Sequence, residues 1–150
     1  MFKRILVPVD GSATSNKALV IALQLARDAG GRVRLLHSVD EFTAVSGFAY
    51  GSDVMQIVRE NAAKVLVDGM AIAKAAGVEA DEQLVDQPDA RLGHTVSEAA
   101  RAWGADLVVV GTHGRRGIGR VLMGSGAEQV TREASVPVLV IRSDEPGEKS

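Results

Sequence analysis

The sequence predicts a doubly wound α/β domain, in which a five-stranded parallel sheet carries helices on both faces. Short apolar runs alternate along the chain with longer segments of helical periodicity, which implies parallel strands joined by right-handed helical crossovers. A glycine follows three of the helical segments, at the position where a left-handed residue commonly ends a helix. Three of the five apolar runs are hydrophobic throughout, as expected of strands that are covered on both faces.

The individual elements follow from local patterns. Leu19, Leu23 and Ala26 recur at i, i+4 and i+7, the spacing of one buried helix face. The third apolar run is the weakest and is expected near an edge of the sheet. The expected strands are residues 5–9, 33–39, 79–85, 107–110 and 136–141, and the expected helices are residues 15–29, 52–76, a segment between Asp89 and Gly104, and 125–134.

Length and composition predict one domain, residues 1–143, with a loose polar tail at residues 144–150. A net charge of −2 gives no electrostatic case for nucleic acid or an anionic membrane as partner. The absence of cysteine excludes disulfides, thiolate catalysis and cysteine-ligated zinc. No apolar stretch reaches the roughly 18–20 residues that cross a bilayer, and no leader peptide is evident, so a cytoplasmic protein is expected.

The most informative segment is GTHGRRGIGRVLMGSG, residues 111–126, which holds six glycines and three arginines. It follows the apolar run 107–110 and leads into the helix expected at Ser125. Glycine allows a backbone to approach a ligand closely, and a helix N-terminus offers unpaired N–H donors to an anion. A strand, a glycine loop and a helix start in this order predict a phosphate site, most simply for a nucleotide.

A second loop supports this site. In doubly wound sheets, ligands bind beyond the carboxyl ends of the strands, where the strand order reverses. The turn Asp10-Gly11-Ser12 follows the first strand, so it would line one crevice with the glycine loop if strands one and four are neighbours. Two common phosphate motifs are absent: residues 75–148 contain no lysine for a P-loop, and Leu122 replaces the last glycine of a dinucleotide fingerprint.

The spacing of Gly111, Gly114, Gly124 and Ser125, G-x2-G-x9-G-[ST], resembles the nucleotide-binding signature of the universal stress protein family. The resemblance covers nearly the whole chain, from the opening segment 5–12 to the final strand. It implies the strand order 3-2-1-4-5. It also implies the ATP-binding branch of the family, with ATP held between the ends of strands one and four.

The same resemblance implies residue roles at the nucleotide. The glycines and serine of the signature would contact phosphates and ribose, and Asp10 would lie near the ribose and a phosphate-bound Mg²⁺ ion. Segments 8–9 and 38–39 would wall the adenine. The residues expected at the nucleotide are Pro8, Val9, Asp10, Ser38, Val39, Gly111, Thr112, His113, Gly114, Arg115, Gly124, Ser125, Gly126 and Ala127.

Several of these residues have structural alternatives. Ser125 and Glu128 have the spacing of a capping box. In that arrangement the serine side chain caps the helix N-terminus instead of contacting a phosphate. Asp10 has the alternative of hydrogen-bonding its own turn. The loop arginines could be exposed to solvent, or at least one could pair with a phosphate, because guanidinium groups match phosphate oxygens well.

Other polar and aromatic residues point away from catalysis. His37, His94 and His113 lack metal-ligand spacing and are not expected to bind anything together. Trp103 is expected in the core and Asp106 in a turn. No set of catalytic residues is evident in the sequence, so no enzymatic activity beyond slow turnover such as ATP hydrolysis is expected.

The function expected is therefore an ATP-binding, nucleotide-dependent regulator of the stress response, with regulatory protein partners that the sequence does not identify. Its apolar last strand, Val136 to Ile141, would pair with a second copy as a homodimer. The alternatives are a family member that acts only through protein contacts, and an enzyme, either a slow ATPase or a nucleotidyl-group transferase. Residues 41–51 form either a lid or dimer surface.

Overall fold

The computed structural model describes residues 2–39, 52–86, 91–112 and 125–142. Strands and helices alternate along the described residues, as the sequence predicts. The strands are β1 (Arg4–Pro8), β2 (Arg32–Ser38), β3 (Ala80–Val85), β4 (Leu107–Gly111) and β5 (Val138–Ile141). The helices are α1 (Ala13–Ala29), α3 (Ser52–Ala76), α4 (Leu92–Trp103) and α5 (Ser125–Glu133).

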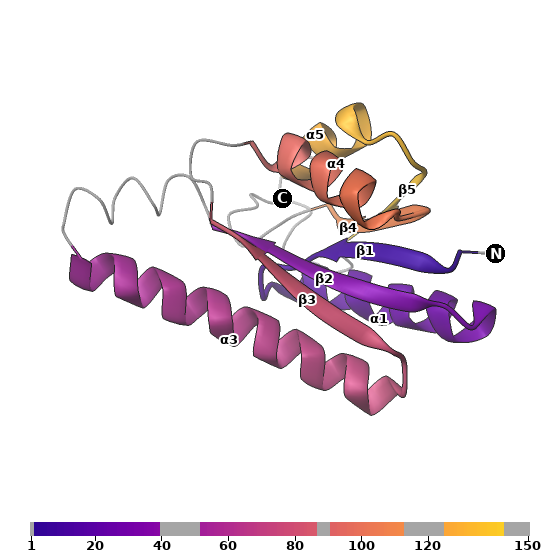
Figure 1. Ribbon diagram of the computed structural model, residues 1–150, viewed down its shortest axis with the longest axis horizontal. Helices are drawn as coiled ribbons and strands as arrows, with labels where there is room; N and C mark the ends of the chain where they lie inside the picture. Colours follow the sequence, from indigo (N-terminus) through magenta and orange to yellow (C-terminus); the bar gives the residue numbers. More distant parts are fainter. Residues whose placement is uncertain (1, 40–51, 87–90, 113–124, 143–150) are drawn as a thin grey trace.

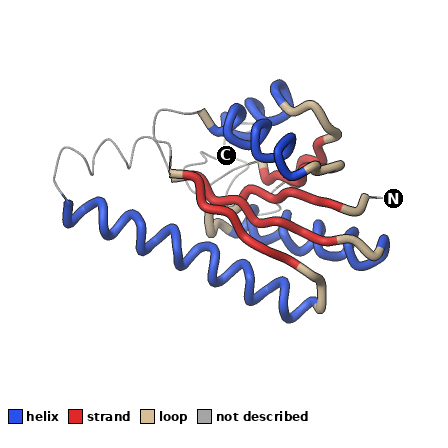
Figure 2. The backbone as a smooth tube through the Cα atoms, viewed as in Figure 1, coloured by secondary structure: helices blue, strands red, loops and turns tan. Residues whose placement is uncertain are grey.

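The strands form one parallel sheet in the order β3-β2-β1-β4-β5. Helices α1 and α3 lie on one face of this sheet, and α4 and α5 lie on the other (Figure 1). The tube in Figure 2 shows the strands running side by side between these helical layers. The predicted fold class and strand order are confirmed, and β3 lies at an edge as expected.

Each face of the sheet carries its own hydrophobic core, because successive strand residues point to opposite faces. On the α1/α3 face, Ile5 and Val7 of β1 pack against buried residues of α1 such as Leu19. On the α4/α5 face, Leu6 packs with Val96 of α4 and its neighbours.

Glycines end three helices, as the sequence predicts. Gly30, Gly77 and Gly104 have φ values of 69°, 71° and 77°, a region that favours glycine because it lacks a Cβ. At the other end of α1, the side chain of Ser12 accepts a hydrogen bond from Ser15 N at 3.1 Å. This cap starts the helix at Ala13, two residues before the predicted start.

The last strand begins later than predicted, at Val138 instead of Val136. Pro137 has no N–H to donate to the ladder, and only its carbonyl pairs, with Val108 N at 3.0 Å. The predictions for residues 41–51, for most of the glycine loop and for the tail lie outside the described residues.

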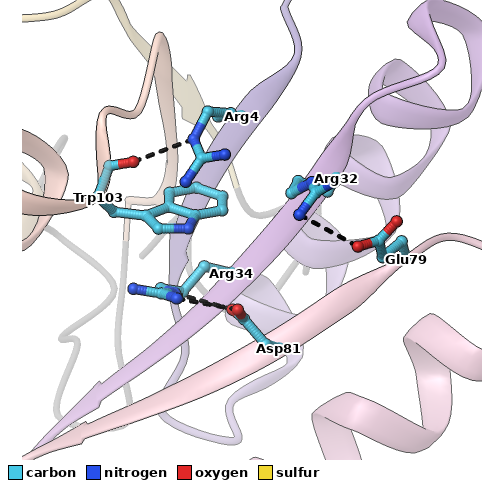
Figure 3. Close-up of polar contacts among 6 residues, drawn as sticks. All are labelled: Arg4, Arg32, Arg34, Glu79, Asp81 and Trp103. Carbon is cyan, nitrogen blue, oxygen red and sulfur yellow. Dashed lines mark hydrogen bonds and ion pairs between the residues drawn. The ribbon is translucent and has the colours of Figure 1, made fainter.

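Trp103 is buried at the carboxyl end of α4, as predicted, but its surroundings are charged. The guanidinium groups of Arg4 and Arg34 lie on its indole ring, with Cζ 4.5 and 4.8 Å from the ring centroid (Figure 3). Arg4 Nε also donates to the Trp103 carbonyl at 3.0 Å. The indole therefore attaches α4 to β1 and β2 through cation–π contacts.

The helices of the described segments do not combine the length and apolar character that crossing a bilayer requires.

Candidate functional site

Strands β1 and β4 are neighbours, with Ile5 opposite Leu107 and Leu6 opposite Val108. The order of the strands reverses at this pair, since β2 follows on one side and β5 on the other. The turn after β1 and Thr112 after β4 therefore lie at the same edge of the sheet. This is where doubly wound α/β domains bind ligands.

The turn after β1 is held by its own side chains. Asp10 Oδ1 accepts a hydrogen bond from Ser12 N at 2.9 Å, and Asp10 N donates to Ser15 Oγ at 3.1 Å. Gly11, between them, has a φ of 84° that favours glycine. The structural alternative for Asp10 is thus confirmed: its carboxylate orders the turn.

Gly111, at the end of β4, lies directly against the start of α1. A Cβ added at Gly111 would lie 2.8 Å from Thr14 Cγ2 and 3.2 Å from the Thr14 carbonyl carbon and oxygen. Packing against Thr14 therefore requires a glycine at position 111, whether or not a ligand binds nearby. Its lack of a side chain lets the end of β4 lie close to the start of α1 at this edge of the sheet.

Thr112 is the next residue and is only 3% exposed. Its backbone N donates to Ile141 O at 2.8 Å, which ties it to β5. Its side-chain Oγ1 has no hydrogen-bond partner within the described part of the chain. Buried hydroxyls are nearly always paired, so a partner for this one is expected beyond the described residues, in the chain or in a bound group.

The predicted adenine-wall residues divide between the two faces of the sheet. Pro8 and Ser38 come two residues after Leu6 and Leu36, whose side chains lie in the α4/α5 core, so they share that face. Val9 and Val39 have their side chains buried on the other face. The four predicted adenine-wall residues therefore do not share one face of the sheet.

At the start of α5, Gly126 and Ala127 are packing residues. A Cβ at Gly126 would lie 2.7 Å from Leu92 Cδ2, and the Ala127 side chain is buried in the α4/α5 core. Only their backbone groups can meet a ligand. Gln129 Oε1 accepts a hydrogen bond from Gly93 N at 3.0 Å, so α5 also caps the N-terminus of α4.

The remaining predicted contacts, His113, Gly114, Arg115 and Gly124, lie outside the described residues, as does the side chain of Ser125. Their roles stay predictions, and so does the capping box. Within the described segments, no group of three His, Cys, Asp or Glu side chains is arranged to hold a metal ion.

Sequence reasoning missed two residues that contact this turn. Ser15 accepts from Asp10 N, and His37 Nδ1 lies 2.8 Å from Val9 O. His37 reaches the turn from β2, so no local motif marks it. Ser15 is only five residues after Asp10, in the first turn of α1, and its hydrogen bond is local.

The fold is that of a doubly wound parallel α/β domain, and the ends of β1 and β4 lie at the reversal of strand order, where such domains bind ligands. A sequence model of the universal stress protein family matches residues 1–142. The chain belongs to the universal stress protein family, and the resemblance seen in its sequence is confirmed.

Individual relatives agree with this assignment. The chain is 33% identical over 145 residues to universal stress protein A homolog 2 of Coxiella burnetii, covering 94% of this chain and 95% of that protein. A universal stress protein family structure from Burkholderia pseudomallei is 34% identical, with a TM-score of 0.76 and coverage of 95% and 97%. A universal stress protein solved in complex with cAMP is 25% identical, with a TM-score of 0.68 and coverage of 94% and 97%.

Proposed function

We propose that this protein binds ATP at the carboxyl ends of β1 and β4 and acts as a nucleotide-dependent regulator in the stress response. The observation that carries the proposal is the junction at this edge. An ordered Asp10 turn lies beside a strand end where Gly111 lacks a side chain and the buried Thr112 hydroxyl lacks a partner among the described residues. At such a junction the Thr112 hydroxyl can donate to a phosphate or ribose oxygen, and the Asp10 carboxylate suits a ribose hydroxyl or a phosphate-bound cation.

The comparisons support an adenine nucleotide. A relative of the same family and fold is solved with cAMP, and two further neighbours that share the fold are solved with dAMP and AMP. ATP is favoured here because the predicted signature, Gly111 to Ser125, supplies a long run of backbone N–H groups before a helix N-terminus.

Asp10 is the residue that would meet a nucleotide-bound Mg²⁺ ion. Nucleotide sites commonly hold Mg²⁺ with one or two carboxylates together with the phosphates. A single ordered carboxylate at the strand end fits that requirement. The ion would neutralise phosphate charge.

The protein would act as a homodimer in the cytoplasm. Strand β5 lies at the edge of the sheet, and its Leu139 is 37% exposed. An apolar edge strand offers unpaired backbone groups to a second copy. The segment Val136 to Ile141 would pair across a two-fold axis.

Calorimetric titration with ATP, ADP, AMP and cAMP, each with and without Mg²⁺, tests the nucleotide proposal. We expect ATP to bind with a dissociation constant in the micromolar range and Gly114→Val to weaken it. Ala102→Val, on the exposed side of α4, is the control and should bind normally. Phosphate release under the same conditions separates a slow ATPase from a binding protein. Absence of binding by all four nucleotides would contradict the proposal and favour a role through protein contacts alone.

A further inference from the structure

We propose that His37 and Ser15 are positioning residues of the nucleotide site, which hold the Val9–Asp10 peptide unit from opposite sides. This inference rests on the proposed function, since Asp10 is the carboxylate expected at the nucleotide. The carbonyl of that peptide unit is held by His37 from β2. Its N–H is held by Ser15 from α1. Both polar groups of one peptide unit are therefore fixed by side chains from two different elements.

The contact between His37 and Val9 O shows which ring nitrogen of His37 carries the hydrogen. Nδ1 lies 2.8 Å from Val9 O, and His37 is half-buried. A carbonyl oxygen only accepts hydrogen bonds, so Nδ1 must carry the hydrogen. The neutral ring is then the Nδ1–H tautomer, and the charged ring would donate through the same atom.

The contact with Ser15 is buried. Its side chain is 5% exposed, and its Oγ accepts from Asp10 N at 3.1 Å. The Ser15 backbone N donates to Ser12 Oγ in the cap of α1. Ser15 therefore joins the peptide unit to the first turn of the helix.

The position in the sheet explains why side chains are needed. Val9 N donates to Leu36 O at 2.8 Å, which continues the β1–β2 pairing to the last residue before the turn. The chain then leaves the sheet, and side chains provide the next hydrogen bonds. With Oδ1 of Asp10 also held by Ser12 N, the direction in which the carboxylate leaves the backbone is set before a ligand arrives. A site ordered in advance binds more tightly, because less freedom is lost on binding.

The first experiment compares His37→Leu with His37→Asn by calorimetric titration with ATP. The Asn amide nitrogen occupies nearly the place of Nδ1 and can donate to the same carbonyl, whereas Leu cannot. We expect His37→Leu to weaken ATP binding about five- to tenfold, the effect of losing one neutral hydrogen bond. His37→Asn should stay within about twofold of wild type. His94→Leu, the same change at an exposed histidine, is the control and should have no effect.

The second experiment tests whether His37 acts through Asp10. The dissociation constants of Asp10→Asn, His37→Leu and the double variant form a mutant cycle. If His37 positions Asp10, the double variant binds ATP about as weakly as Asp10→Asn alone. Independent losses that multiply would overturn the inference, because they would mean that His37 acts on folding or on the ligand by another route.

The outcomes separate the two proposals. If the wild-type protein binds no nucleotide, the proposed function itself fails. If it binds ATP and His37→Leu binds equally well, only the positioning role fails. In the nucleotide-free protein, a long-range ¹H–¹⁵N spectrum of the imidazole should show the neutral ring protonated at Nδ1. A neutral ring protonated at Nε2 would overturn the geometry whatever the nucleotide result.

Discussion

Arg34 and Asp81 form a two-point ion pair across β2 and β3, with Nε–Oδ1 and Nη2–Oδ2 distances of 2.8 and 2.9 Å (Figure 3). The same guanidinium lies on the indole of Trp103. The pair lies on the side of the sheet that carries α4. Arg34 of β2 therefore links Trp103 of α4 to Asp81 of the edge strand β3.

This ion pair predicts a small acid-dependent stability. The hydrogen bonds from Arg34 hold the pKa of Asp81 below its ordinary value, against the opposing effect of partial burial. A lowered folded-state pKa contributes stability above the ordinary value of about 3.9, and this is lost as the pH falls through the folded pKa. Asp81→Asn should cost less than about 1 kcal/mol at pH 7, because the Asp81 side chain is exposed and solvent screens the pair. Urea unfolding should show the difference from wild type shrinking below about pH 4, and an unchanged difference at pH 2.5 would contradict this account.

The α4–α5 contact predicts different costs for two glycine substitutions. A Cβ at Gly93 would lie 2.7 Å from Gln129 Cβ and 2.8 Å from the Gln129 carbonyl, which cannot move alone. A Cβ at Gly126 would meet only the end of the Leu92 side chain. Gly93→Ala should therefore destabilise the protein by about 1–3 kcal/mol, and Gly126→Ala by less. Thermal unfolding of both variants gives the comparison, and the reverse ranking would show that the helices adjust freely.

The approach of Gly111 to Thr14 predicts a rescue. Gly111→Ala should lower both stability and ATP affinity, because it pushes the end of β4 away from the start of α1. The shortest overlap is with Thr14 Cγ2, at 2.8 Å. Removing that methyl group with Thr14→Ser should restore part of both quantities in the double variant. Thermal unfolding and calorimetric titration measure them, and no recovery would mean that the backbone overlap dominates.

The buried hydroxyl of Thr112 predicts a separation of stability from binding. Thr112→Val keeps the shape of the side chain and removes an Oγ1 that is unpaired among the described residues. Because the substitution removes no hydrogen bond to another described residue, the free energy of unfolding should stay the same or rise. ATP affinity should fall by up to about tenfold, the worth of one hydrogen bond. Loss of stability without loss of affinity would assign the hydroxyl to the fold.

The proposed dimer predicts unequal effects at the two sheet edges. Leu139→Lys in β5 should shift the protein toward monomer, because it places a charge at the proposed interface. Leu84→Lys in β3, an exposed leucine at the opposite edge, is the matched control and should leave the mass unchanged. Analytical ultracentrifugation reports both masses. A monomeric wild type would contradict the proposal outright.

Much of this protein was predictable from local sequence. Apolar runs, helical spacing and the glycines at 30, 77 and 104 set the order and nearly the bounds of the elements, because these signals act over a few residues. The bounds that were wrong depended on single groups, such as the Ser12 side chain that starts α1 and the missing N–H of Pro137. The pattern of glycines also predicted the family.

The sequence by itself determined the fold class, and it predicted the two loops of the candidate site. Only the tertiary structure decided which distant groups meet: His37 on the Val9 carbonyl, Gly111 against Thr14, and two guanidinium groups on Trp103. The physical reason is the separation along the sequence between the residues that interact. Turns and helices, and with them the Ser15 contact, arise from neighbours in the chain. The contacts of His37, Gly111 and Trp103 join residues far apart in the sequence, whose placement depends on how the elements pack together.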